Sequence, residues 1–354
     1  MTHPRINLGI AISAMNGGYV DSTLNALVSD RTDDTRITLH IATNTSFDSA
    51  AFSRRFQDQI TFIVHDTNYA DQPKGSDNKG KSENYQLEKK QSITCYITHH
   101  KEPVSILKLW GQALADIADQ QLAENLATKH LHPNDQNTIN YAAVIDTHCP
   151  IKAGWLNHVL LQARNGHAVF YGPVEPGWPL NNSNIIGYLI EYAQFKSPVT
   201  CDSEFPGNNI IFRTELLGNR DELRRQGFFK TFLLWRLKKE QRTEPVYSEE
   251  IPVYYQKNFQ LTHYLKRRLT HGRCFAGCRL KQENQPHRLL CIAFTPALFI
   301  LRTFRIYQWV KPKNDLKKAF FRYAPQIIAS EVAWSIGEFL GYSFGEKDSC
   351  ENLD

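Results

Sequence analysis

The chain has 354 residues, of which 42% are hydrophobic, 12% aromatic and 22% charged. This composition is ample for a packed core and excludes a disordered chain. The length exceeds that of one average domain, so we expect one large domain with a smaller one appended. The first residues run directly into an apolar, strand-like stretch, without the pattern of a secretory signal.

Seven cysteines are scattered along the sequence, an odd number. We expect reduced thiols in a cytoplasmic protein, not a disulfide framework. Cys274 and Cys278 are four residues apart, but no second pair with zinc-ligand spacing accompanies them, which argues against a structural zinc site.

The net charge of +5 is unevenly distributed. Residues 257–322 contain fifteen Lys or Arg and only two acids, so the rest of the chain is acidic. Such asymmetry indicates a basic surface that faces an anionic partner, either a membrane or a nucleic acid. Platforms that stack nucleic-acid bases interleave aromatic residues with polar ones. The aromatic residues of this segment are interleaved with aliphatic residues instead. We therefore expect an anionic membrane surface and no nucleic acid.

The first elements alternate as strand, helix and strand. Residues 6–14 form a β-branched apolar run, residues 20–28 place apolar side chains on one helix face, and residues 37–41 form a second strand. This order predicts a parallel, right-handed unit of an open α/β sheet. A third strand is expected at 60–64, and the polar stretch 66–92 predicts a loop or insertion.

Further elements follow the same alternation. We expect strands at 141–145, 168–171 and 207–212, and helices at 104–128, 154–163, 185–195, 229–239 and 325–342. Between Arg288 and Arg302 lie thirteen uncharged, mostly apolar residues, whereas a membrane-spanning helix needs about 20. Pro296 interrupts this run. The sequence thus predicts peripheral membrane binding, with packing as a core helix as the alternative.

The strand at 141–145 ends in Asp146-Thr147-His148. Ligands of open α/β sheets bind outside the carboxyl ends of the strands, and two side chains at this spacing can point to the same side. Mg²⁺ or Mn²⁺ accepts a carboxylate ligand, and Mn²⁺ accepts imidazole as well. Such a cation can bridge two phosphates and take up charge as a diphosphate leaves. The triplet therefore favours a metal–diphosphate site.

The segment Asp146-Thr147-His148-Cys149-Pro150, followed by Gly154-Trp155-Leu156, resembles the signature of glycosyltransferase family 2. Other segments resemble that family in chain order: 10–16, 110–115, 171–174, 191–192, 206–213, 271–279 and 337–345. The last two are similar to segments of bacterial polysaccharide members. The resemblance implies an α/β fold of GT-A type, with a mixed sheet flanked by helices over 1–270. It leaves 271–354 as a basic and apolar helical C-terminal extension.

The resemblance also implies a function. A sugar would move, with inversion, from a nucleotide-diphosphate donor to a saccharide or lipid-linked acceptor in polysaccharide or glycoconjugate assembly. Asp146 and His148 would hold Mn²⁺ or Mg²⁺. The protein would be cytoplasmic and bound at the inner face of a membrane. The residues implied in donor binding are Ala14, Asn16, Thr43, Ser46, Trp110, Asp146, Asn208, Asn209 and Arg213. We expect Trp155 and Leu156 to be core residues, not ligand contacts.

Two departures from the family pattern leave alternatives open. Thr43 stands where the family places an aspartate for the base and ribose of the donor. Lys230 stands where the family places its general base, and an amine of ordinary pKa near 10.4 cannot take the acceptor's proton. Asp221, Glu222 or Glu240 would then supply the carboxylate. His263, His271 or Tyr255 would supply a third metal ligand, where the resemblance requires one. The alternative is a catalytically degenerate pseudoenzyme that acts as a scaffold or partner protein.

Overall fold

The computed structural model describes residues 5–14, 19–30, 35–44, 49–67, 93–100, 104–131, 138–199, 204–240, 243–281 and 287–353. The chain forms two compact units, one of residues 1–173 and 202–254 and one of residues 174–201 and 255–354. The division expected at residue 270 falls inside a single helix. The units divide elsewhere because residues 185–195 pack against the C-terminal helices.

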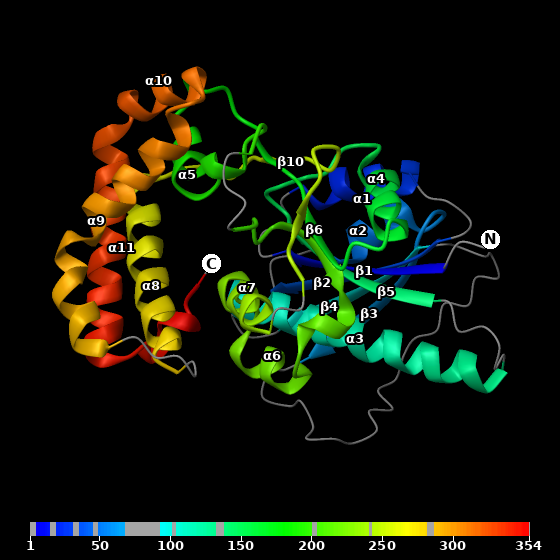
Figure 1. The fold of residues 1–354 in the computed structure, drawn as a ribbon. Helices are drawn as coiled ribbons and strands as arrows, with labels where there is room; N and C mark the ends of the chain where they lie inside the picture. The colour runs from blue at the N-terminus through cyan, green and yellow to red at the C-terminus, as the bar shows by residue number, and fades with distance from the viewer. Residues whose placement is uncertain are drawn as a thin grey trace. The chain divides into compact units, whose positions relative to one another are not determined.

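The first unit is built on an eight-stranded sheet of order β3-β4-β2-β1-β5-β8-β6-β9 (Figure 1). Strands β3, β4, β2, β1 and β5 are parallel, β8 is antiparallel to both β5 and β6, and β6 is parallel to β9. The strands are β1 (Arg5–Ala14), β2 (Thr35–Asn44), β3 (Thr61–Thr67), β4 (Ile93–His100), β5 (Thr138–Asp146), β6 (Val169–Tyr171), β8 (Asn209–Arg213) and β9 (Val246–Tyr247). This mostly parallel, mixed sheet confirms the predicted α/β fold class.

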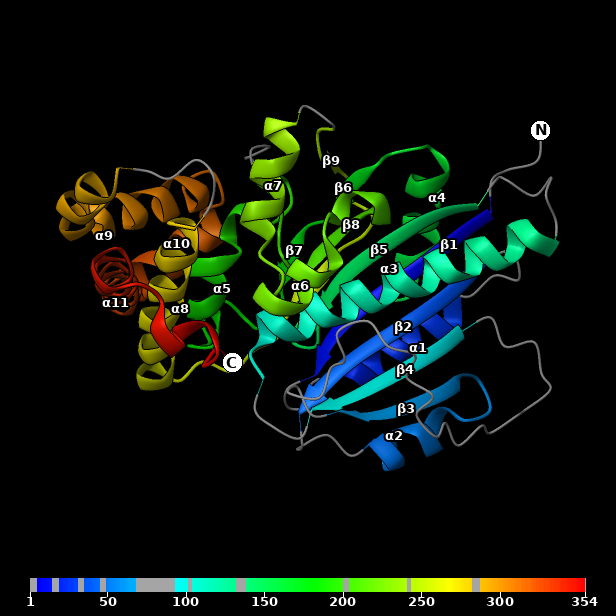
Figure 2. The same ribbon diagram turned by 90° about the horizontal axis from the view of Figure 1, so that it is seen from below.

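Helices cover both faces of this sheet. Figures 1 and 2 show α1, α2 and α4 on one face and α3 and α6 on the other, with α3 lying along the strands. The helices of this unit are α1 (Val20–Asp30), α2 (Ser49–Phe56), α3 (Ile106–Leu131), α4 (Trp155–Arg164), the short η3 (Thr214–Leu217), α6 (Arg220–Gln226) and α7 (Lys230–Lys239). The expected polar loop 66–92 lies outside the described residues, apart from the end of β3.

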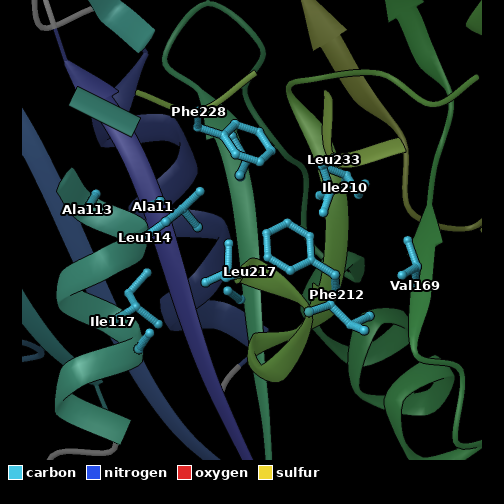
Figure 3. Close-up of a cluster of buried hydrophobic side chains, with 14 of the residues drawn as sticks. Ala11, Ala113, Leu114, Ile117, Val169, Ile210, Phe212, Leu217, Phe228 and Leu233 are labelled. Atoms are coloured by element: carbon cyan, nitrogen blue, oxygen red, sulfur yellow. The ribbon is translucent and has the colours of Figure 1, made fainter. Parts of the chain in front are cut away.

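A cluster of buried apolar side chains joins α3 and α7 to the sheet (Figure 3). Helix α3 approaches the sheet closely at Gly9 of β1, where an added Cβ would lie 2.3 Å from a side-chain carbon of Ile117. Only glycine allows α3 to approach the strand so closely. The cluster includes Ala11, Ala113, Leu114, Ile117, Ile210, Phe212, Phe228 and Leu233. This core fixes the strands whose carboxyl ends carry the predicted site.

The second unit is mainly helical. Its elements are β7 (Val174–Pro176), α5 (Ile185–Glu191), η2 (Ala193–Phe195), α8 (Leu261–Arg279), α9 (Arg288–Val310), α10 (Asn314–Arg322), α11 (Ala324–Phe344) and η4 (Lys347–Cys350). The chain enters it through β10 (Val253–Tyr255), and the Tyr255 carbonyl accepts from the Gly177 N–H. Helix α11 packs along α8 and α9. The predicted C-terminal helical extension is therefore present.

Pro296 lies inside one continuous helix, α9, and does not break it as the sequence suggests. Proline removes one helical N–H, and beside it the Thr295 hydroxyl donates to the Cys291 carbonyl at 2.5 Å. The helix is 23 residues long, and in the described part of the chain it is the one helix long and apolar enough to cross a membrane. Leu289 is 80% exposed and Phe294 is 70% exposed, so α9 is not a core helix.

Cys274 and Cys350 form a disulfide, which corrects the expectation of seven reduced thiols. The two residues are 76 positions apart in sequence, so their pairing depends on the packing of the C-terminal segment against α8. The sulfur of Cys278 lies 3.5 Å from that of Cys350. Burial, with a smaller contribution from Glu346, raises the pKa of the Cys278 thiol to about 11.

Candidate functional site

Asp146 is the last residue of β5, and His148 follows it in a turn. One carboxylate oxygen of Asp146 accepts the backbone N–H of His148 at 2.8 Å and lies 3.2 Å from its Nδ1. The Cys149 N–H donates to the Asp146 carbonyl at 2.8 Å, which closes the turn. The side chains of His148 and Asp146 are 20% and 13% exposed, so a ligand can reach both.

The donor set of this pair fits a small divalent cation. Two cis ligands at about 2.1 Å from an octahedral ion lie roughly 3 Å apart, which is close to the 3.2 Å between the Asp146 carboxylate and His148 Nδ1. Carboxylate and imidazole together suit Mn²⁺. Among the described residues no third His, Cys, Asp or Glu groups with this pair. Phosphate oxygens and water would have to complete the coordination.

The neighbouring ends of β1 and β2 add polar groups to the same edge of the sheet. The Thr43 hydroxyl is fully buried and donates to the Ala14 carbonyl at 2.7 Å. Ser13 lies opposite Asp146 in the β1–β5 register, and its buried hydroxyl has no hydrogen-bond partner in the described part of the chain. Sequence reasoning missed Ser13, although a hydroxyl near the end of an otherwise apolar strand is a signal that could have identified it.

Asn208 and Asn209 also reach this edge, because β8 runs antiparallel and Asn209 lies opposite Ile145. The Asn208 side-chain amide donates to the sulfur of Cys149 at 2.8 Å. The Asn209 amide donates to the carbonyls of Pro173 at 3.2 Å and Ile251 at 2.7 Å. Both side-chain oxygens are buried without a partner among the described residues. The two amides thus fasten the loops beside the turn that carries Asp146, and both side chains are fully buried.

Gly172 is required by the same close packing. An added Cβ would lie 2.1 Å from the Ile251 carbonyl oxygen and 2.8 Å from the Asn209 amide nitrogen. A side chain at this position would therefore push β6 away from the loop that holds Asn209.

Lys230 is the first residue of α7, and it lies beside the loop that leads into Asn208. Its stem packs on Gly207, where an added Cβ would be 3.1 Å from Lys230 Cδ. Its ammonium group donates to the Phe205 carbonyl at 3.0 Å. A cavity of about 200 Å³ adjoins it, lined in part by Glu204 and Trp235.

Other predicted residues lie elsewhere in the first unit. Asp221 and Glu222 lie in the first turn of α6, which packs on the middle of α3 through the Arg220–Asp119 ion pair. Arg213 lies opposite Tyr141, four residues along β8 from Asn209, and donates to the Gly166 carbonyl. The structure does not bring these three side chains to the edge that carries Asp146.

Trp110 packs against the buried cluster, and its indole N–H has no partner among the described residues. Asn16 and Ser46 lie outside the described residues, so their predicted donor contacts stay predictions. Trp155 and Leu156 are 2% and 0% exposed, which confirms that they are core residues.

His263, His271 and Tyr255, considered as a third metal ligand, belong to the second unit. The His271 ring packs on Trp334 with 5.0 Å between ring centroids. Tyr255 packs against Tyr188 and Tyr192. These contacts give His271 and Tyr255 packing roles within their own unit.

No protein-family model matches this sequence, and no curated protein matches it. Solved structures align over nearly the whole chain. A mannosyltransferase from Pyrobaculum calidifontis in complex with GDP-Man and Mn²⁺ aligns over 97% of this chain and 88% of its own, with 10% identity and a TM-score of 0.45. S. aureus TarS (residues 1–349) in complex with UDP-GlcNAc aligns over 96% and 92%, with 13% identity and a TM-score of 0.42.

Fold and site together define an α/β protein with a mixed sheet and an acid–imidazole pair at the carboxyl end of a central strand.

Proposed function

We propose that this chain is a divalent-metal-dependent glycosyltransferase with a nucleotide-diphosphate sugar as its donor. The observation that carries the proposal is the position of Asp146 and His148. A carboxylate oxygen of Asp146 and Nδ1 of His148 lie 3.2 Å apart at the carboxyl end of β5, where open α/β sheets bind ligands. A bound Mn²⁺ or Mg²⁺ would supply Lewis-acid stabilisation of the departing diphosphate.

The surrounding residues support binding of a polar donor. The Asn208 amide fastens the turn that carries the partly exposed Asp146 and His148, through its hydrogen bond to the sulfur of Cys149. The ammonium of Lys230 is a hydrogen-bond donor at a helix N-terminus, which suits a phosphate contact better than proton abstraction. We propose a saccharide or lipid-linked acceptor and an inverting transfer, in polysaccharide or glycoconjugate assembly.

A second candidate is a pseudoenzyme that acts as a scaffold. Lys230, in place of a carboxylate, favours this candidate, as do Asp221 and Glu222 on α6, away from the edge that carries Asp146. The two candidates differ in turnover. A transferase releases nucleoside diphosphate when an acceptor is present, whereas a scaffold does not.

The proposal is tested by thermal unfolding with a panel of nucleotide sugars, with and without Mn²⁺. A ligand at 100 times its dissociation constant stabilises the folded state by about 2.7 kcal/mol. Asp146→Ala should abolish the metal-dependent stabilisation, measured against the variant's own ligand-free midpoint, because the hydrogen bond to the His148 N–H is lost as well. Asp58→Ala, at an exposed turn, is the matched control. Equal stabilisation of parent and Asp146→Ala by nucleotide and Mn²⁺ would refute the assignment.

We further propose that the chain acts on the inner face of a membrane, which it binds peripherally through α9 and the basic residues that follow. Exposed apolar side chains recur along one face of α9 at Leu290, Phe294, Leu301 and Phe304. The opposite face packs on α11 and holds the buried Thr295 and Ile306. An amphipathic helix of this kind lies in the interface plane, where cationic side chains meet anionic lipid.

A further inference from the structure

A cavity of about 520 Å³ lies in the second unit between α8 and the C-terminal segment. Figure 1 shows this segment, in red, beside the end of α8. The α8 side comes from one helix face, because the lining residues at 263, 266, 267, 270 and 273 follow helical spacing. Lys347, Asp348 and Ser349 belong to the other wall. The volume suits a small-molecule ligand, but the described lining is polar throughout, unlike the usual apolar pocket.

The charges of this cavity are unbalanced. Lys266, Arg267, Arg273 and Lys347 supply four cations, and Asp348 is the one acid of the lining. Among the described residues no carboxylate lies within salt-bridge distance of Lys266, Arg273 or Lys347, whereas Arg267 pairs with Glu191 at 2.7 Å outside the lining. Converging cations without counter-charges repel one another, and an anion would relieve this repulsion.

Two links hold the wall formed by the C-terminal segment against α8. The Cys274–Cys350 disulfide ties it to α8, and Arg273 Nε donates to the Gly345 carbonyl at 3.1 Å. Lys347 itself has a φ of 44°, a left-handed conformation that residues other than glycine rarely adopt. Strain of this kind persists where surrounding structure imposes it, often at ligand sites. The fold thus places Lys347 at the cavity against its local backbone preference.

We propose that this cavity binds a phosphate or diphosphate group, through Lys266, Arg273 and Lys347. With Arg267 paired to Glu191, the three remaining cations exceed the one acid of the lining by two charges, which a phosphate or diphosphate can balance, and a guanidinium binds phosphate oxygens in pairs. The hydroxyls of Thr270 and Ser349 add donors of the type that phosphate accepts. The disulfide keeps the two walls together. This binding does not depend on the transferase activity proposed above, because all of its residues belong to the second unit.

Titration calorimetry with inorganic pyrophosphate tests the proposal. The double variant Lys266→Gln/Lys347→Gln removes two exposed charges that have no ion-pair partner among the described residues, so we expect it to fold. Its affinity for pyrophosphate should fall at least about tenfold, since hydrogen bonds to charged groups are lost. Lys317→Gln/Lys318→Gln on α10 is the matched control and should bind as the parent does. Failure of the parent to bind millimolar pyrophosphate, or equal binding by the first double variant, would overturn the site.

Two further arms identify the source of the phosphate and the role of the disulfide. Vesicles of equal charge, containing either phosphatidic acid or phosphatidylglycerol, distinguish capture of a lipid phosphomonoester from general membrane attraction. A preference for phosphatidic acid that the Lys266→Gln/Lys347→Gln variant loses assigns the site to a lipid headgroup. Pyrophosphate binding without that preference assigns it to a soluble phosphate compound. Cys350→Ser should weaken pyrophosphate binding several-fold, and an unchanged affinity would refute the role of the disulfide.

Discussion

Asp30, at the end of α1, accepts the backbone N–H of Gly154 with both carboxylate oxygens at 2.7 Å and that of Leu156 at 3.2 Å. It therefore caps α4, the helix that follows the turn carrying Asp146 and His148, although it lies 124 residues earlier in the sequence. Gly154 has a φ of 94°, a left-handed conformation that favours glycine. Trp155 and Leu156, which follow it, are core residues.

We predict that Asp30→Ala lowers the free energy of unfolding by about 1–3 kcal/mol, because a buried cap with charged hydrogen bonds is lost. Asp30→Asn keeps an acceptor and should lose less. Urea denaturation measures both variants. An unchanged midpoint for Asp30→Ala would show that the cap contributes nothing to stability.

The position of Lys230 predicts a loss of affinity without a loss of fold. Lys230→Met keeps the stem that packs on Gly207 but removes the ammonium, so nucleotide affinity should fall about tenfold, the loss of about 1.4 kcal/mol of charged hydrogen bonding. The pH optimum of any activity should not move. Lys239→Met, at the other end of α7, is the control. Unaltered nucleotide affinity in Lys230→Met would remove Lys230 from the site.

A buried ion network should hold the helices of the second unit together. Glu331 is fully buried on α11 and accepts from Arg268 at 2.7 Å and from Arg302, and both guanidinium groups lie over the Trp334 ring. Glu331→Gln leaves the buried Arg268 and the half-buried Arg302 without their counter-charge and should destabilise the fold by about 3–5 kcal/mol.

Lys281→Gln is the control for this network, because it removes an exposed partner of Glu346 and should change stability by less than about 1 kcal/mol. Chemical denaturation measures both variants. Similar small effects of the two would show that the network is dispensable.

His271 predicts a specific pH dependence. Burial, reinforced by Arg268, lowers its pKa to about 3 from an ordinary 6.5, while Glu191 acts in the opposite direction and Arg267 and Arg302 add to the lowering. The unfolded chain then binds a proton that the folded chain does not, so this stability is complete above pH 6.5 and is lost as pH falls toward 3. In His271→Gln the dependence over this range should be shallower than in the parent. His263→Gln, on the same helix, is the control, and identical pH profiles for parent and His271→Gln would contradict the prediction.

The exposed face of α9 predicts vesicle binding. Flotation with vesicles containing anionic lipid should recover the protein, binding should fall with salt, and it should weaken when Lys311, Lys317 and Lys318 become Gln, since each cation contributes about 1 kcal/mol at such a surface. Phe294→Ser/Leu301→Ser tests the apolar contribution. Protein that stays soluble with acidic vesicles at low salt would exclude this role.

The local pattern of the sequence determined most of the first unit. Apolar runs with a period of two or about 3.6 predict strands and helices, and β1, α1, β5 and α4 fall where these patterns place them. The position of Asp146 and His148 at a strand end follows from the same reasoning, because it depends on residues adjacent in the chain. The sequence analysis did not predict strand β4, although its buried and less buried residues alternate as in a strand. The strand begins directly after the long polar stretch 66–92, which hides its start.

Only the tertiary structure decided which distant residues meet. The Cys274–Cys350 disulfide, the Asp30 cap on α4, the contact of Lys230 with Gly207 and the cavity between α8 and the C-terminal segment each join segments that are far apart in sequence or come from different elements. Periodicity reports which face of an element is apolar but not which partner covers it. That partner depends on how the chain reverses and packs. In the sequence, residues 263–273 show only scattered charges, but they form one wall of a cavity because residues 347–352 fold back against α8.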